Sequence, residues 1–179
     1  MVLIQDGDHR AFENLYERYA HRLNGFFYKM LWADREMAED NVHDLFAKII
    51  DRPELFKQGN DVKPWLFRIA ANMCKNAYRK RSFENTYREQ LEEQQIFISS
   101  VERKIDENIQ SGMLSEALDK LDEDRRTMFL LRYQQDLSLK EIAAIFDLPE
   151  GTIKSRIFYI KKLLAGAIED HEIILKDGK

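Results

Sequence analysis

The apolar side chains of this chain recur every three or four residues along most of its length, and little interrupts the pattern. Only three prolines and seven glycines occur among 179 residues. A β-sandwich or a Rossmann unit needs more turns and more β-branched strands than this composition supplies. The spacing therefore predicts an all-α protein. Amphipathic stripes cover 11–26 and 42–50, and further helices are expected over about 64–81, 84–95, 112–121, 123–134, 138–146 and 150–168.

The composition is that of a folded chain in a reducing compartment. Hydrophobic residues make up 44% and charged residues 34%, too apolar for a disordered chain and too charged for a membrane protein. The first seven residues are too short and too soon acidic for a signal peptide, and no apolar run approaches the ~18 residues of a membrane span. The single cysteine, Cys74, excludes an internal disulfide, so we expect a cytoplasmic protein and a half-buried or buried thiol.

Charge divides the chain into blocks that the net value of −4 conceals. Residues 62–81 carry six cationic and no acidic side chains, whereas residues 82–124 carry four cationic and twelve acidic ones. Such a division predicts two modules and a connector. We expect two small helical domains, 1–81 and 112–179, joined by an acidic connector over 82–111.

The helix expected from Pro64 carries a basic face. Its apolar positions should face the core, and a second stripe at the same spacing lies about a third of a turn away. That stripe could neutralise phosphates and bind a base edge, with nearby aromatic rings stacking on unpaired bases. A plain solvated face, with Trp65 and Phe67 in the core, is the alternative. The core stripe is Leu66, Ile69, Met73 and Ala77, the basic stripe is Arg68, Asn72, Lys75 and Arg79, and the aromatic residues are Trp65, Phe67 and Tyr78.

A helix-turn-helix pattern lies near the C-terminus. Ser138 and Glu141 form a capping box that opens a short helix, a turn follows over 147–149, and a second helix begins near residue 150. Four basic and no acidic residues lie between Gly151 and Ile168. A capped helix followed by a basic helix is typical of major-groove recognition, although an ordinary antiparallel helix pair would share the spacing.

The order of these segments resembles that of the extracytoplasmic-function sigma factors, the small promoter-recognition subunits of bacterial RNA polymerase. The similarity runs over nearly the whole chain. It is carried by AEDNVHDLF at 38–46, WLFRIA at 65–70 followed by Asn72, EIA at 141–143 and GTIKSR at 151–156. Two positions depart from the family pattern: His43 stands where glutamine is usual, and Asp147 stands where glycine is usual.

The resemblance implies a binding function without catalytic residues, metal or other cofactor. The outward face of the helix over 40–48 would contact core RNA polymerase through Asp40, His43, Asp44 and Lys48. The loop and helix that follow would capture an extruded base of the minus-10 element and its phosphates through Phe56, Lys57, Asn60, Lys63, Arg68, Asn72, Lys75, Arg79 and Lys80. The helix-turn-helix would read the minus-35 duplex through Ser138, Lys140, Lys154, Ser155, Arg156, Tyr159, Lys161 and Lys162.

The family also implies partners. Besides core polymerase and promoter DNA, we expect an anti-sigma factor, which could be anchored in a membrane, and we expect the free chain to be a monomer. The acidic connector would occupy polymerase surfaces built for nucleic acid, or would be an ordinary solvated linker. Two other functions remain open: a dimeric helix-turn-helix regulator that acts without polymerase, and a helical metalloenzyme built around Glu39 and His43.

Overall fold

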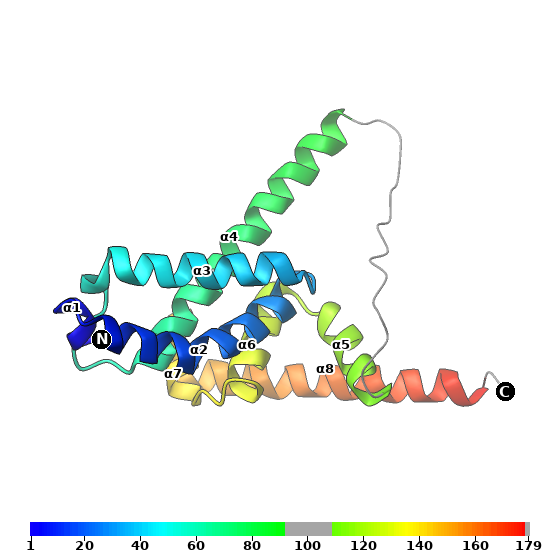
Figure 1. Cartoon of the computed structure of the whole chain (residues 1–179). Helices are drawn as coiled ribbons and strands as arrows, with labels where there is room; N and C mark the ends of the chain where they lie inside the picture. The colour runs from blue at the N-terminus through cyan, green and yellow to red at the C-terminus, as the bar shows by residue number, and fades with distance from the viewer. Residues whose placement is uncertain (92–108, 178–179) are drawn as a thin grey trace.

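A computed structural model describes residues 1–91 and 109–177, and every regular element in these two ranges is a helix (Figure 1). The all-α prediction is confirmed. Residues 92–108, which are part of the connector expected over 82–111, lie outside the described residues. In chain order the elements are α1 (Val2–Gln5), α2 (His9–Met30), α3 (Arg35–Asp51), the 3-10 turn η1 (Pro53–Leu55), α4 (Val62–Leu91), α5 (Ile109–Asp119), α6 (Glu123–Tyr133), α7 (Leu139–Phe146) and α8 (Glu150–Asp177).

The N-terminal module is built on the antiparallel pair α2 and α3, with α4 packed across it (Figure 1). Asp8 and Asp34 begin the two helices as N-caps, and their carboxylates accept hydrogen bonds from the amides of Ala11 (3.1 Å) and Met37 (2.9 Å). Each such cap stabilises a helix by about 1 kcal/mol. The rings of Phe26 and Phe67 meet edge to face at 5.6 Å in the fully buried centre.

The C-terminal module packs α5, α6 and α7 against α8 (Figure 1). The capping box at Ser138 is confirmed: its hydroxyl accepts from the Glu141 amide at 3.2 Å, and the Glu141 carboxylate accepts from the Ser138 amide at 2.6 Å. Asp147 ends α7 at φ 53°, ψ 48°, the left-handed conformation expected where the family has glycine. Four apolar side chains of α8, spaced three or four residues apart, are buried against these helices: Ile153, Ile157, Ile160 and Leu164.

The buried side chains of the two modules form one continuous cluster. The contact joins α2 and α4 of the first module to α6 and α7 of the second. Gly25, in α2, lies at this contact: a Cβ atom there would lie 3.3 Å from the side-chain amide nitrogen of Gln134. The sequence predicts two modules, but it does not predict that they share a core.

Helix α4 is longer than the sequence predicts. Expected helices over 64–81 and 84–95 are joined, because α4 continues unbroken to Leu91. No proline or glycine occurs between residues 65 and 91, so elongation adds a hydrogen bond per residue with nothing to stop it. Helix α8 likewise continues to Asp177 rather than ending near residue 168. Within the described residues, none of these helices is long and apolar enough to cross a membrane.

Candidate nucleic-acid interface

The outward face of α3 is polar, as predicted. Val42, Leu45, Phe46 and Ile49 are buried, and the opposite face is exposed. Phe12 and Tyr16 from α2 cover Phe46, with ring centroids at 5.9 and 4.7 Å. Ile50, expected in the buried stripe, is 55% exposed because it lies at the edge of the stripe in the last turn of α3. The exposed face carries all four residues of the candidate polymerase contact, Asp40, His43, Asp44 and Lys48.

A hollow of about 320 Å³ lies beside this face, between α2 and α3. His21, Glu39 and His43 are among the residues that line it. Across the described parts of the chain, however, no three His, Cys, Asp or Glu side chains are placed to hold a metal ion together. The hollow therefore gives the metalloenzyme hypothesis no support.

The basic stripe of α4 is exposed on the face opposite the core. Its members are Arg68, Asn72, Lys75 and Arg79, with Lys80 exposed beside them. The aromatic residues belong to the core instead: Trp65 and Phe67 are buried, and the Tyr78 hydroxyl donates to the Met30 carbonyl at 2.6 Å. The sequence left open whether the rings stack on bases or belong to the core, and the structure places Trp65 and Phe67 in the core. Of the α4 residues predicted to contact DNA bases, Asn72 and the cations are the exposed ones.

One residue predicted to contact DNA from the candidate base-capture loop is buried instead. Phe56 is only 5% exposed and packs edge to face on Trp65 at 5.1 Å, so its ring cannot stack on an extruded base in this structure. Lys57 and Asn60 are exposed, and the loop turns at Gly59 with φ 87°. Lys63 is half-buried in the first turn of α4.

Helix α8 presents a mixed basic and aromatic surface. Tyr159 is 63% exposed, and the neighbouring Phe158 is 64% exposed. Ser155 donates its hydroxyl to the Gly151 carbonyl at 3.0 Å, which leaves its oxygen as an acceptor. The remaining predicted contacts of the helix-turn-helix are all exposed, namely Ser138, Lys140, Lys154, Arg156, Lys161 and Lys162.

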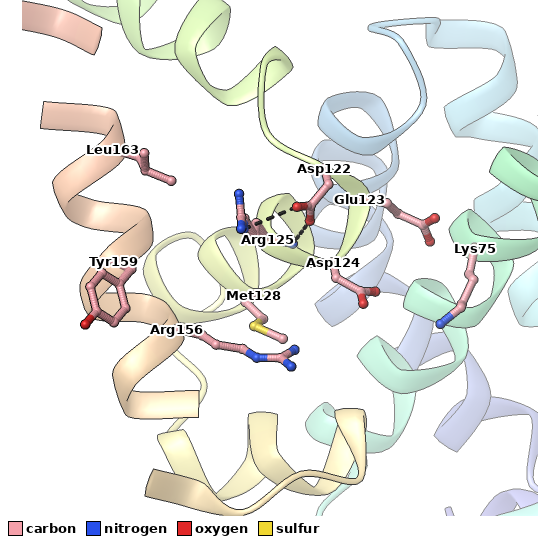
Figure 2. Close-up of a pocket in the computed structure, with 9 residues that line it drawn as sticks. All are labelled: Lys75, Asp122, Glu123, Asp124, Arg125, Met128, Arg156, Tyr159 and Leu163. Carbon is pink, nitrogen blue, oxygen red and sulfur yellow. Dashed lines mark hydrogen bonds and ion pairs between the residues drawn. The ribbon is translucent and has the colours of Figure 1, made fainter. Parts of the chain in front are cut away.

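The two candidate DNA faces meet at one cleft of about 630 Å³ (Figure 2). Lys75 reaches it from α4, and Arg156 and Tyr159 reach it from α8. The acidic N-terminus of α6 also lines the cleft, through its N-cap Asp122 and the first-turn residues Glu123 and Asp124. Burial raises the pKa of Glu123 and Asp124 raises it further, whereas Lys75 and Arg79 act to lower it. Carboxylates of the second module thus lie near cations of the first module that the sequence predicts to bind phosphates.

Polar contacts also join the two modules near the C-terminal end of α6. Arg22 of α2 donates to the side-chain oxygen of Gln135 at 3.2 Å and to its backbone carbonyl at 3.3 Å, and Gln135 is only 1% exposed. Burial lowers the pKa of Lys63 and Arg22 lowers it further, while Asp136 and Glu141 of the second module act to raise it. The pairing of Arg22 with Gln135 could not be predicted from sequence, because no local pattern indicates a contact between residues 113 positions apart.

Two further side chains are engaged inside the first module. The Arg81 guanidinium lies over the Trp32 ring, 4.1 Å from its centroid, a cation–π contact that holds α4 to the α2–α3 turn. Cys74 is fully buried, as expected, and burial raises the pKa of its thiol.

Comparison with known proteins matches both modules to sequence families. Residues 15–84 match the family described as Sigma-70 region 2, and residues 111–164 match Sigma-70 region 4. The ECF RNA polymerase sigma-E factor of Escherichia coli is 31% identical over 176 residues, covering 93% of this chain and 91% of that protein. The sigma-H factor of Pseudomonas aeruginosa is 29% identical over 175 residues, covering 93% and 90%.

Solved structures share the fold. The sigma factor RpoE of Bartonella quintana, in complex with the anti-sigma factor NepR, aligns with a TM-score of 0.72 at 24% identity over 89% of this chain and 98% of that one. CnrH, in complex with the cytosolic domain of CnrY, aligns with a TM-score of 0.70 at 22% identity over 94% of both chains.

Proposed function

The chain belongs to the extracytoplasmic-function sigma factors of bacterial RNA polymerase, and we propose that it binds core polymerase through α3 and promoter DNA through α4 and α8. The observation that carries this proposal is the pair of exposed basic faces, one on each module of a single chain. Residues 1–81 serve as the minus-10 module, 112–179 as the minus-35 module and 82–111 as the connector. Both partners are macromolecules, and the role is one of binding in the cytoplasm.

On the polymerase side, the face of Asp40, His43, Asp44 and Lys48 lies on a rigid helix whose inner side is fully packed. A polar face of mixed charge suits a charged partner surface, because electrostatic complementarity selects the partner and the register. The imidazole of His43 takes the place of an amide in the family pattern, so it supplies one donor and one acceptor when neutral.

On the minus-10 side, the loop over 57–61 and the α4 stripe capture the non-template strand after one base has left the stack. Flipping a base costs a few kcal/mol, which a matching pocket returns. Lys57, Asn60 and Asn72 supply exposed amide and ammonium groups for that base, while the cations of α4 hold phosphates. The phosphate contacts are Lys63, Arg68, Lys75, Arg79 and Lys80.

On the minus-35 side, α8 enters the major groove of the duplex. Lys154, Ser155, Tyr159 and Lys162 face the bases, and Arg156 and Lys161 face phosphates. Ser138 and Lys140, at the start of α7, contact the backbone. All of these side chains are exposed on one module, as such a role requires.

Promoter binding requires the modules to separate. The two elements lie about 25 base pairs apart, or about 85 Å along B-form DNA at 3.4 Å per pair. In this structure Lys75 and Arg156 line one cleft, so the two faces cannot reach both elements together. We therefore assign this arrangement to the free or inhibited protein, a monomer. An anti-sigma factor, possibly membrane-anchored, would stabilise it, as the complexes of the two structural relatives suggest.

Core-dependent transcription from a genomic library, with initiation sites mapped, tests the proposal. The expected result is initiation from a small set of promoters only when both core polymerase and this chain are present. Tight binding to duplex DNA by the chain alone, together with no core-dependent transcription, would overturn it. A palindromic operator and a stable dimer would instead support the alternative of a helix-turn-helix regulator, which the family assignment does not favour.

A further inference from the structure

The side chain of Gln5 bridges the N-terminal turn to the segment that leads into the base-capture loop. Its amide nitrogen donates to the carbonyl oxygen of Pro53 at 2.8 Å and to that of Phe56 at 3.0 Å. A primary amide has two N–H donors, so both are used. The acceptors belong to residues 48 and 51 positions away, and α1 packs against both η1 and α2.

The carbonyl groups of Pro53 and Phe56 belong to the segment that holds Phe56 in place, immediately before the loop. The Pro53 oxygen also accepts the Phe56 amide at 3.2 Å, which closes the η1 turn. The Phe56 ring is held on Trp65 of α4. Phe56 is therefore fixed through its side chain, its amide and its carbonyl, while residues 57–61 beyond it are exposed.

Little within the loop itself fixes its path. The Asn60 amide donates to the Lys57 carbonyl at 3.3 Å across the turn at Gly59, and the Asp61 carbonyl accepts from the Trp65 amide at 3.4 Å where α4 begins. A glycine in the left-handed region gives a short loop wide conformational freedom. The direction in which Lys57 and Asn60 project is thus set by how Phe56 is held.

We propose that Gln5 is a positioning residue for minus-10 recognition: its two hydrogen bonds set the path of the loop that contacts the extruded base. This inference rests on the proposed function of that loop. Gln5 does not contact DNA and lies in α1, outside the residues matched to Sigma-70 region 2. Its substitution should therefore alter base preference at the minus-10 element and nothing at the minus-35 element.

The test uses holoenzyme reconstituted with Gln5→Glu, Gln5→Ala or the unchanged chain, on two promoter libraries randomised at one element each. Gln5→Glu keeps the shape of the side chain but replaces the donor with a carboxylate facing two carbonyls. Gln5→Ala removes the donor and leaves those carbonyls to water. Each net hydrogen bond lost corresponds to roughly a fivefold effect, so discrimination at the extruded base should fall about five- to twenty-fivefold. Asp6→Ala, an exposed neighbour, is the matched control and should leave both profiles unchanged.

Thermal melting checks that each variant is folded, and Gln5→Ala decides the result if Gln5→Glu does not fold. A flattened minus-10 profile with an unchanged minus-35 profile supports the inference. An unchanged minus-10 profile, or an equal loss at both elements, overturns it. If the unchanged chain directs no core-dependent transcription, the proposed function itself fails, which is a separate outcome.

Discussion

The contact between Arg22 and Gln135 should be a main polar stabiliser of the packed arrangement. Arg22→Ala removes the two donors that reach the side-chain and backbone oxygens of Gln135. Gln135 is 1% exposed, so water cannot replace those donors while the modules stay together. The ion pair from Arg22 to Asp136 is long, at 3.9 Å, and the Asp136 side chain is 81% exposed.

The expected magnitude follows from these contacts. A buried acceptor left without a partner costs about 1–3 kcal/mol, whereas an exposed ion pair contributes about 0–1 kcal/mol. Arg22→Ala should therefore lower the free energy of unfolding by about 2 kcal/mol. The Gln135→Ala variant loses the side-chain acceptor of this contact but keeps the backbone carbonyl. The double variant should therefore be less destabilised than the sum of the single ones by about 1 kcal/mol, the net value of one hydrogen bond.

Urea unfolding, followed by circular dichroism, is measured for the unchanged chain, the two single variants and the double variant. The difference between the double variant and the sum of the single ones is the coupling energy. Arg18→Ala is the matched control, since Arg18 is an exposed arginine one turn earlier in α2, and it should change stability by less than about 0.5 kcal/mol. A coupling energy within about 0.5 kcal/mol of zero would refute the reasoning, because the contact would then contribute nothing to holding the modules together.

Three further predictions concern single side chains. Asp147→Gly should stabilise the chain by about 1 kcal/mol and raise the melting temperature by a few degrees, because glycine adopts the observed φ of 53° without a Cβ clash; a lower melting temperature would contradict this. Glu123→Gln should stabilise the chain near pH 7. The raised pKa of Glu123 means that the folded chain binds this proton more tightly than the unfolded chain, so stability falls as pH rises through that range. The gain should shrink in melts at lower pH, and a gain independent of pH would contradict the reasoning. Lys75→Ala should weaken holoenzyme binding to promoters of any sequence and reduce the slope of log K against log salt by about 1; an unchanged slope would remove Lys75 from the phosphate contacts.

The local features of the fold were predictable from sequence because they depend on neighbouring residues. The capping box at Ser138, the left-handed Asp147 and the polar outer face of α3 each follow from side chains within a few positions of one another. Helix α4 was divided wrongly near residue 81 because the charge pattern changes there. Charge does not stop a helix, however, and only proline, glycine or a competing cap would have done so.

The positions of aromatic side chains also could not be predicted from sequence. Phe56 and Trp65 flank a basic loop, where rings of this kind can stack on bases or on each other. Sequence does not separate the two outcomes, since both bury the same apolar surface. The packing between the modules could not be predicted from sequence either. Arg22 and Gln135 are polar residues in segments far apart in the chain, and only the fold brings them together.

The shared core has a consequence for exchanging parts among relatives. Gly25 and Arg22 on α2 fit the Gln134–Gln135 segment of this chain's own second module. A chimera carrying the C-terminal module of another family member would still present both DNA-binding faces when extended on polymerase. It would lose the fit that closes the molecule on itself. Each module could thus be exchanged without loss of DNA binding, whereas the closed arrangement requires two modules that come from the same protein.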